Sequence, residues 1–425
     1  MPFARLQALG WRALPALHPA LDAPLAEVLA GAPAERVLDR LLRALRPDAA
    51  GRACAAEALF GVGLWRRRLR WHLGGATESP RLLLALLLRD LCGRADAAPL
   101  AGLAPDALPP PRPPPDALAD RWSLPDWLAR ELVEAAGPEA GALAAALCRP
   151  GPIFLRVNRL RATRQALAER LAAGGVATRP GRLAPDALEV LGARLNLVGL
   201  PAWRDGWLEV QDEGSQLVAE ALGARPGEAV LDRCAGAGGK ALALAAAVGP
   251  AGRVHCCDLD AGRLDRLEAR AGRAGASDIV VRHGAAPPEG LLVDRALVDV
   301  PCSELGPLRR GPDLRWRLDP SAFAALPALQ GRLLADAAAC VRPGGRLVYA
   351  TCTFRRGENE AVARAFEAAQ PAWRRAVPSV PGETLDGDGA LRLLPHRHGT
   401  DGFYAVAWDR TDSTRQPGDQ VDSRP

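Results

Sequence analysis

Short apolar strands alternate with helices through the second half of this chain, and the alternation constrains the fold more than any other feature. Strands are predicted at 229–232, 253–258, 278–282, 295–299 and 346–350, with helices following Lys240 and spanning 261–271. This order predicts a doubly wound, Rossmann-like parallel α/β sheet. In such sheets ligands bind at the carboxyl ends of the strands, so residues at those ends are the first site candidates.

The rest of the chain divides into further predicted parts. Apolar residues recur at helical spacing through residues 1–97, which predicts an all-α domain. Residues 98–120 contain the proline run 109–115 and are expected to form a semi-rigid linker. The remaining boundaries are a small α/β subdomain at 121–205, the domain of the doubly wound sheet at 206–410, and a disordered tail at 411–425.

Composition excludes several classes of protein. Hydrophobic residues make up 48% of the chain, which is enough for a folded core. No apolar run reaches the ~18 residues of a membrane span, and no signal peptide is recognisable. The nine cysteines lack the paired spacing of zinc ligands, so no metal site is expected. We predict a cytoplasmic enzyme with reduced thiols, active as a monomer.

The basic residues are almost all arginine. The net charge of +5 permits a nucleic-acid partner without indicating one. The stretch Leu64–Trp71 interleaves arginines with two tryptophans, which fits either an RNA-contacting helix or an amphipathic helix with a solvated basic face. Lys240 is the only lysine. Its retention suggests a position where a compact ammonium is needed and a planar guanidinium is not accepted.

The strand at 229–232 leads into a run of small residues that fits a cofactor-binding loop. Small residues let the backbone approach a ligand closely, and the N-terminus of the next helix favours a polar or anionic group. The loop residues are Cys234, Ala235, Gly236, Ala237, Gly238, Gly239 and Lys240. A plain tight turn would have a similar composition, and the spacing is neither a P-loop nor a GxGxxG fingerprint.

Asp258 ends the next strand, about 20 residues after this loop. An acid at that distance can accept hydrogen bonds from ribose hydroxyls. The pair of loop and acid therefore suggests a nucleoside-bearing cofactor. Capping of the following helix by Asp258 or Asp260 is the alternative.

Two cysteines follow two further strands of the predicted sheet. Cys302 comes after the strand that ends at Asp299, and Cys352 comes after the strand at 346–350. A buried cysteine is often only a small apolar residue, and Cys148 and Cys340 are read in that way. Two strand-end cysteines beside an acid indicate thiol chemistry instead, with Lys240 as a candidate activating cation.

At these residues the sequence resembles the Sun/RsmB family of S-adenosylmethionine-dependent RNA cytosine-5 methyltransferases. The resemblance covers nearly the whole chain, and the helical N-terminal part is similar to the NusB-like RNA-binding domain of the RsmB branch. It is carried by the ordered blocks Leu155–Asn158, Val210–Leu217, Cys234–Lys240, Asp299–Ser303, Leu308–Trp316, Tyr349–Cys352, Glu358–Glu360 and Asp401–Phe403.

The resemblance implies a mechanism and a role for each residue. Cys352 would add to carbon 6 of cytosine and thereby make carbon 5 nucleophilic, and Asp299 would hydrogen-bond nitrogen 3. Cys302 would assist release of Cys352 after methyl transfer, and Lys240 would reach the active site. The loop Cys234–Lys240 would hold the methionine part of S-adenosylmethionine.

The resemblance also implies contacts to the cofactor and to the RNA. Asp258 would bind the ribose of S-adenosylmethionine. Arg156 and Asn158 would hold the RNA substrate, with a plain strand of the small subdomain as the alternative. The substrate implied is 16S ribosomal RNA.

Two departures from the family pattern bear on the site. Glu304 stands where glycine is common, which changes the charge beside the site. The third strand ends in Arg282–Ala285, without the acid that normally lies near the adenine.

Other functions remain open at this point. A transfer RNA cytosine-5 methyltransferase and a catalytically inactive ribosome-assembly factor are the alternatives. A DNA cytosine-5 methyltransferase would use the cysteine of the Pro-Cys turn and would not need Cys352.

Overall fold

The structure is a computed structural model that describes residues 3–192 and 197–411. The chain divides into two compact units. The helical unit comprises Met1–Pro150 and Leu308–Pro320, and the α/β unit comprises Gly151–Pro307 and Ser321–Pro425. From residue 412 onward, the predicted tail lies outside the described residues.

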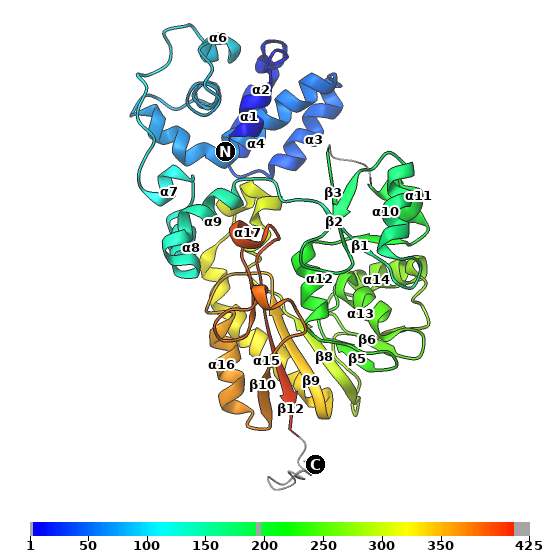
Figure 1. The fold of residues 1–425 in the computed structure, drawn as a ribbon. Helices are drawn as coiled ribbons and strands as arrows, with labels where there is room; N and C mark the ends of the chain where they lie inside the picture. The colour runs from blue at the N-terminus through cyan, green and yellow to red at the C-terminus, as the bar shows by residue number, and fades with distance from the viewer. Residues whose placement is uncertain (1–2, 193–196, 412–425) are drawn as a thin grey trace, which may run out of the picture. The chain divides into compact units, whose positions relative to one another are not determined.

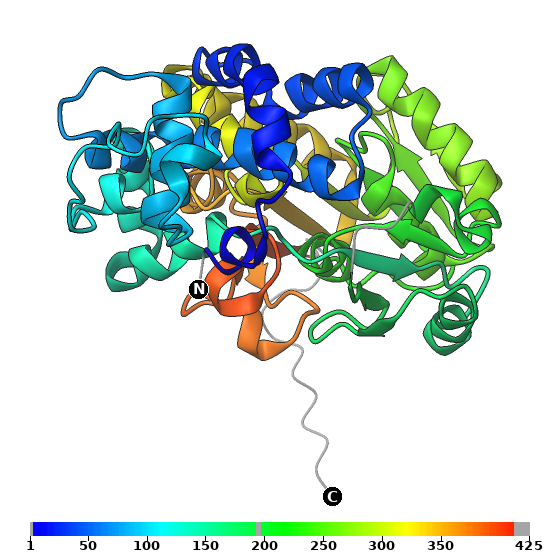
Figure 2. The same ribbon diagram turned by 90° about the horizontal axis from the view of Figure 1, so that it is seen from above.

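The helical unit is built around the long helix α4 (Ala49–Leu73), whose buried side chains pack against α2, α3 and α5 (Figures 1 and 2). Asp48 caps its N-terminus, since its carboxylate accepts a hydrogen bond from Gly51 N–H at 2.7 Å. The core is rich in leucine and alanine, with Trp11 and Trp65 fully buried. The other helices are α1 (Ala4–Ala8), α2 (Leu14–Leu29), α3 (Ala34–Leu45), α5 (Pro80–Leu86), α6 (Ala97–Leu100), α7 (Leu118–Arg121), α8 (Asp126–Ala136) and α9 (Ala140–Leu147).

The basic stretch Leu64–Trp71 lies near the C-terminal end of α4, and its arginines have partners within the helical unit. Arg67 forms ion pairs at 2.6 Å with Asp120 and with Asp126. Arg68 is buried and donates to a backbone carbonyl. Most of this charge is therefore used within the unit. The sequence pattern could not reveal this, because the acids that pair with Arg67 lie more than fifty residues away along the chain.

The proline-rich segment 98–120 is largely irregular, as its composition predicts. The segment also contacts Trp71 of α4. The Trp71 indole N–H donates to Pro113 O at 3.0 Å, and the Arg112 guanidinium lies 4.3 Å from the Trp71 ring centre. The compact helical unit continues beyond this segment to Pro150.

The segment Leu308–Trp316, one of the blocks that carry the family resemblance, belongs to the helical unit and not to the α/β unit. Arg315 is fully buried and donates to Leu147 O at 2.9 Å. The Arg66 guanidinium stacks 4.1 Å from the Trp316 ring centre. This segment therefore packs against a unit that begins some 300 residues earlier in the sequence.

The α/β unit begins with a small antiparallel sheet of strand order β2-β3-β1-β4. The helix α10 (Arg164–Ala173) packs on it through Leu167 and Leu171. The strands are β1 (Phe154–Val157), β2 (Thr178–Pro180), β3 (Ala187–Val190) and β4 (Leu208–Val210). Strand β4 lies beyond the boundary predicted at 205, and the helices from 118 to 147 belong to the helical unit.

The main sheet has the order β10-β12-β9-β8-β5-β6-β7, and β11 pairs with β12. The strands from β9 to β7 are parallel, whereas β12 runs antiparallel to β9. Their bounds are β5 (Ala229–Asp232), β6 (Arg253–Cys256), β7 (Val280–Arg282), β8 (Val293–Asp299), β9 (Val341–Thr351), β10 (Trp373–Ala376), β11 (Leu391–Leu393) and β12 (Phe403–Arg410).

Helices cover both faces of this sheet, which confirms the predicted doubly wound fold (Figure 1). One face packs on α12 (Glu213–Glu220), α13 (Gly239–Val248) and α14 (Ala261–Ala274), and the other on α15 (Leu326–Cys340) and α16 (Glu360–Ala369). None of the helices in the described ranges is both long and apolar enough to cross a membrane.

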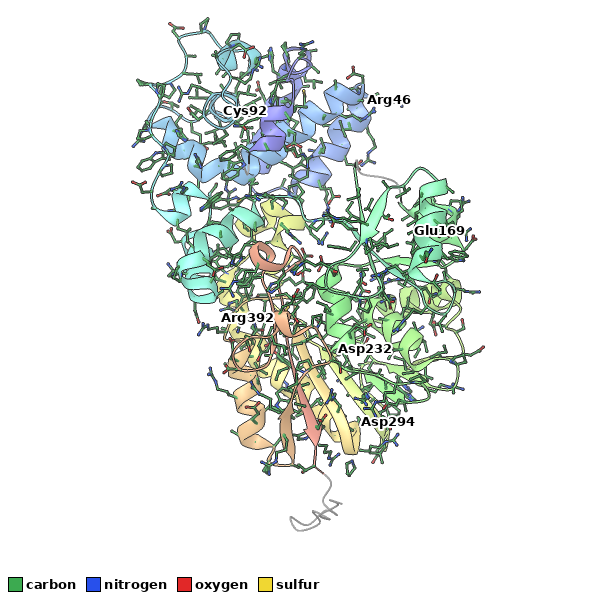
Figure 3. The ribbon with its side chains drawn as sticks, viewed as in Figure 1. Arg46, Cys92, Glu169, Asp232, Asp294 and Arg392 are labelled. Atoms are coloured by element: carbon green, nitrogen blue, oxygen red, sulfur yellow. The ribbon has the colours of Figure 1, made fainter. Side chains whose placement is uncertain are left out.

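The chain places β6 and β7 on one side of β5 and then returns to add β8 on the other side. The strand order therefore reverses between β5 and β8, and ligands bind at the carboxyl ends of strands at such a point. Asp232 lies at this end of β5, whereas Asp294 lies near the opposite end of the sheet, at the start of β8 (Figure 3).

Candidate active site

A cavity of about 540 Å³ opens at the carboxyl ends of β5, β6, β8 and β9. Most of the residues predicted from the sequence line it together. They are Cys234, Ala235, Gly236, Gly239, Lys240, Asp258, Asp299, Cys302 and Cys352. Ala237 and Gly238 lie in the same loop but do not line the cavity. The fold thus brings together groups that are up to 118 residues apart in the chain.

The loop between β5 and α13 depends on glycines with positive φ angles. Gly236 has φ 54° and Gly238 has φ 88°. A Cβ atom on Gly238 would lie 2.1 Å from Leu267 Cδ1, whereas a Cβ on Gly236 would meet nothing within 4 Å. Gly238 is therefore required for packing as well as for backbone conformation.

Asp258 ties this loop to the end of β6. Its carboxylate accepts hydrogen bonds from Gly236 N–H at 2.8 Å and from Asp260 N–H at 2.9 Å. The helix cap is a different residue, because Asp260 accepts from Arg263 N–H at the start of α14. Asp258 therefore stands at the edge of the loop and also lines the cavity.

Lys240 forms an ion pair with Asp299, with 2.6 Å between Nζ and Oδ2. Burial alone would lower the pKa of Lys240, but the charge and hydrogen bond of Asp299 outweigh it and raise that pKa. The only lysine of the chain is thus a mostly buried cation that holds the Asp299 carboxylate beside the cavity.

Cys302 and Cys352 are free thiols whose sulfur atoms lie 3.3 Å apart. The hydrogen bond between them, followed by burial, raises the pKa of Cys352 well above its usual value. The two turns that carry them are also joined, since Gly306 N–H donates to Cys352 O at 2.9 Å. In the free protein, Cys352 is therefore a protonated thiol at neutral pH.

Comparison with known proteins places the chain in a family. A family model described as 16S rRNA methyltransferase RsmB/F matches residues 219–408, and one for the ferredoxin-like domain of RsmF/B-like methyltransferases matches residues 124–194. A probable ribosomal RNA small subunit methyltransferase B from Synechocystis sp. is 37% identical over 68% of this chain and 67% of its own length. The chain belongs to the RsmB/F methyltransferase family.

Other relatives agree with this assignment to the RsmB/F family. The putative methyltransferase MT1451 of Mycobacterium tuberculosis is 36% identical over 76% of this chain and 71% of its own length. The probable ribosomal RNA small subunit methyltransferase B of Bacillus subtilis is 36% identical over 68% of this chain and 66% of its own length. The match thus spans about two thirds of each of the first relatives.

Solved structures support the fold of this RsmB/F family member. The crystal structure of PH0851 superposes with a TM-score of 0.73 at 24% identity, over 93% of this chain and 99% of that one. The structure of NSun6 from Pyrococcus horikoshii with SFG gives a TM-score of 0.61 at 20% identity, over 68% and 98% of the two chains.

Arg156 and Asn158, the predicted RNA-contacting residues, lie inside the α/β unit of this RsmB/F protein. Arg156 donates to Gln211 Oε1 at 2.5 Å and to Gly239 O at 2.6 Å. Asn158 Nδ2 donates to Gly206 O and to the carbonyl of residue 274, both at 2.8 Å. These bonds join β1 of the small sheet to the main-sheet layer, which favours the structural alternative. Contact of either side chain with RNA stays a prediction.

Asp232 is a site residue that the sequence reasoning missed. It lines the cavity at the end of β5, it is only 2% exposed, and its Oδ1 has no hydrogen-bond partner among the described residues. Burial and the nearby charge of Asp299 raise the pKa of Asp232 to about 7. Its position as the last residue of β5, the first strand of the parallel sheet, could have marked it as a site residue.

Replacing Asp232 with asparagine should stabilise the free RsmB/F protein increasingly as the pH rises. The unfolded carboxyl has a pKa near ~3.9, so between about pH 4 and 7 the folded protein binds more protons than the unfolded one. The free-energy penalty for ionising Asp232 in the folded protein is absent below this pH window and reaches its full size above it. The stability difference should grow by up to about 1.4 kcal/mol per pH unit and then level off.

Urea midpoints of wild type and Asp232→Asn, measured from pH 5 to 8 without cofactor, check this expectation. A difference that does not change across that range would contradict a raised pKa for Asp232.

Replacing Gly238 with alanine should damage the loop far more than the same change at Gly236. Both positions have a positive φ, so the backbone cost of alanine is shared, about 1 kcal/mol. Only the Gly238 variant must also displace Leu267. We expect Gly238→Ala to lower the melting temperature clearly more than Gly236→Ala, as differential scanning calorimetry would measure. Equal shifts would mean that the contact with Leu267 is unimportant.

Proposed function

We propose that this protein transfers a methyl group from S-adenosylmethionine to carbon 5 of a cytosine in 16S ribosomal RNA, through a covalent bond between Cys352 and the base. The observation that carries the proposal is the pair of thiols, Cys302 and Cys352, 3.3 Å apart in one cavity with Asp299. The description of the matching family names 16S rRNA, which supports the choice of RNA.

The residues of the cavity fit S-adenosylmethionine. Asp258 can accept hydrogen bonds from ribose hydroxyls, and the loop after β5 lets the backbone approach the ligand. The unpartnered Asp232 Oδ1 is a buried acceptor that suits a positively charged amino group. When bound, S-adenosylmethionine supplies an electrophilic methyl group on a sulfonium sulfur.

Cytosine needs activation, because its carbon 5 is a weak nucleophile. Addition of Cys352 Sγ to carbon 6 moves the ring electrons toward carbon 5 and nitrogen 3. The thiol loses its proton in this step, and the proton can pass through Asp299 to nitrogen 3. Lys240 holds Asp299 in place for this transfer, with its Nζ 2.6 Å from the carboxylate.

After methyl transfer, carbon 5 carries both the methyl group and its original proton. Removal of that proton restores the double bond between carbons 5 and 6 and expels Cys352. Cys302 can protonate the departing sulfur, because its own sulfur lies 3.3 Å away. The proton on nitrogen 3 then leaves through Asp299 and restores the Cys302 thiol, and the proton from carbon 5 is released to solvent.

Methylation of in vitro transcribed 16S rRNA, mapped by bisulfite sequencing, tests the proposal. A second arm uses the same RNA made with 5-fluorocytidine, in which loss of the carbon 5 substituent is blocked and a protein–RNA adduct should accumulate. If the protein methylates transfer RNA and not 16S rRNA, the substrate in this proposal is wrong. Methylation at any atom other than carbon 5, or the absence of an adduct, would reject the mechanism.

A further inference from the structure

A second cavity, of about 510 Å³, lies at the end of the main sheet where β5, β8 and β9 begin and β12 ends. It is opposite the candidate active site, since Figure 3 shows Asp294 near the start of β8 and Asp232 at the other end of the sheet. Strand β8 has seven residues, so the two cavities are roughly 20 Å apart at ~3.3 Å per residue. We refer to the second one as the basic cavity, because the charged residues that line it are Arg225, Arg295, Arg346, Arg410 and Asp409.

Strand pairing and one loop bring these charged residues together. Arg295 of β8 lies opposite Arg346 of β9, and Arg346 lies opposite Asp409 of β12. Arg410 is the last residue of β12, and Arg225 comes from the loop between α12 and β5. The four guanidinium groups of the basic cavity therefore come from four separate segments of the chain.

Two of the four arginines are neutralised by acids. Arg295 Nε donates to the Glu228 carboxylate at 2.6 Å. Arg346 donates to both oxygens of the Asp409 carboxylate, at 2.7 Å and 3.1 Å. The side chains of these two arginines are only 11% and 19% exposed. Because a charge removed from water needs a partner, these two ion pairs are part of the fold itself.

The other two arginines form no ion pair with any acid that the structure describes. Arg410 donates to the backbone carbonyl of Val341. Arg225 is exposed, and its guanidinium has no hydrogen-bond or ion-pair partner within residues 3–192 and 197–411. Four arginines against two acids leave an excess of two positive charges in the basic cavity. The cavity is therefore suited to an anionic ligand.

We propose that the basic cavity binds a backbone phosphate of the substrate RNA, with Arg225 and Arg410 donating to its oxygens, an inference that rests on the proposed function. The forked donors of arginine match the oxygens of a phosphate group. RNA carries such a group at every nucleotide, and 16S rRNA is long enough to reach both ends of the sheet. A phosphate contact fixes the position of the RNA on the protein without reading its bases. Arg225 is therefore assigned to RNA binding and not to catalysis.

The test compares the binding of Arg225 variants to in vitro transcribed 16S rRNA over a range of salt concentrations. Arg225→Ala removes the charge, Arg225→Glu reverses it, and Arg225→Lys keeps it without the forked donors. Because Arg225 is exposed and its side chain makes no bond that the structure shows, these changes should leave the melting temperature unaltered. Arg364→Ala and Arg364→Glu are the matched controls, since Arg364 is an exposed arginine of α16 that does not line the basic cavity.

We expect Arg225→Ala to weaken RNA binding by ~3- to 10-fold near 0.1 M salt, Arg225→Glu to weaken it further, and Arg225→Lys to retain most of it. The slope of log affinity against log salt concentration should become shallower by ~0.7 to 0.9 for Arg225→Ala, because the loss of one phosphate contact releases fewer counterions. The KM for RNA in methyl transfer should rise by the same factor as the dissociation constant. The Arg364 controls should match wild type in both affinity and slope.

Unchanged affinity and slope in Arg225→Glu would overturn the inference, and so would an equal loss in Arg364→Glu, since net charge alone would then explain the effect. Inorganic triphosphate, followed by calorimetry, is the probe for a small phosphate ligand. Triphosphate binding that depends on Arg225, together with unchanged RNA binding, would assign the basic cavity to such a ligand and overturn the RNA contact. If the Arg225 variants lose RNA binding while wild type leaves carbon 5 of every cytosine in 16S rRNA unmethylated, the proposed function is rejected and the phosphate contact stands.

Discussion

Replacing Cys352 with alanine should abolish methyl transfer to RNA, with a loss of at least ~10³-fold in rate. Without the sulfur there is no addition to carbon 6, and carbon 5 stays too weak a nucleophile. Cofactor affinity should change little, because Asp258, Asp232 and the loop after β5 remain in place. Single-turnover transfer of labelled methyl to 16S rRNA and equilibrium binding of S-adenosylmethionine measure the two quantities separately.

Cys340→Ala is the matched control for this experiment. It makes the same chemical change at a buried cysteine of α15 that does not line the cavity. The control should retain full activity. Substantial methylation by the Cys352 variant would remove the covalent mechanism, and equal inactivation of both variants would point to a folding defect.

Replacing Cys302 with alanine should trap a covalent complex of protein and RNA. Two effects act in the same direction. The hydrogen bond between Cys352 and Cys302 is the largest cause of the raised pKa of Cys352, so its loss lowers that pKa and favours attack on the base. Its loss also removes the group placed to protonate the departing sulfur. The adduct should appear as a slowly migrating band on denaturing gels.

The double variant Cys302→Ala/Cys352→Ala provides the control, since it should form no adduct. The pH at which Cys352 reacts with iodoacetamide, followed by peptide mass spectrometry, should also fall in the single Cys302 variant. An adduct that forms through Cys302 when Cys352 is replaced would reverse the roles of the two cysteines.

The site could be predicted in large part because parallel strands end at one edge of a sheet. Once the strands ending at Asp232, Asp258 and Asp299 were predicted, the residues at these ends were expected to be neighbours. Cys352 was expected at the same edge, because it follows another parallel strand. What the pattern could not supply was the distance between the two sulfur atoms or the ion pair of Lys240 with Asp299, since both depend on side-chain packing.

The arginines have partners within the protein that the sequence pattern did not indicate. Arg156 suggested a contact with RNA, but it is buried and bonded to Gln211 and Gly239. The stretch Leu64–Trp71 suggested either an RNA-contacting helix or a solvated basic face, and within it Arg67 is paired with two acids from distant segments. A charge in a sequence shows only that a partner is required. Whether the partner is RNA or the protein itself depends on contacts between residues far apart in the chain.

The sequence alone determined the doubly wound sheet, the loop after its first strand and the residues at the strand ends, because these follow from local periodicity and from the geometry of parallel strands. Only the tertiary structure decided which charges are buried, that Asp232 belongs to the site, and that Glu304 is held with a positive φ beside two thiols. The physical reason is that pKa values and side-chain contacts depend on burial and on neighbours in space, which a linear pattern does not specify.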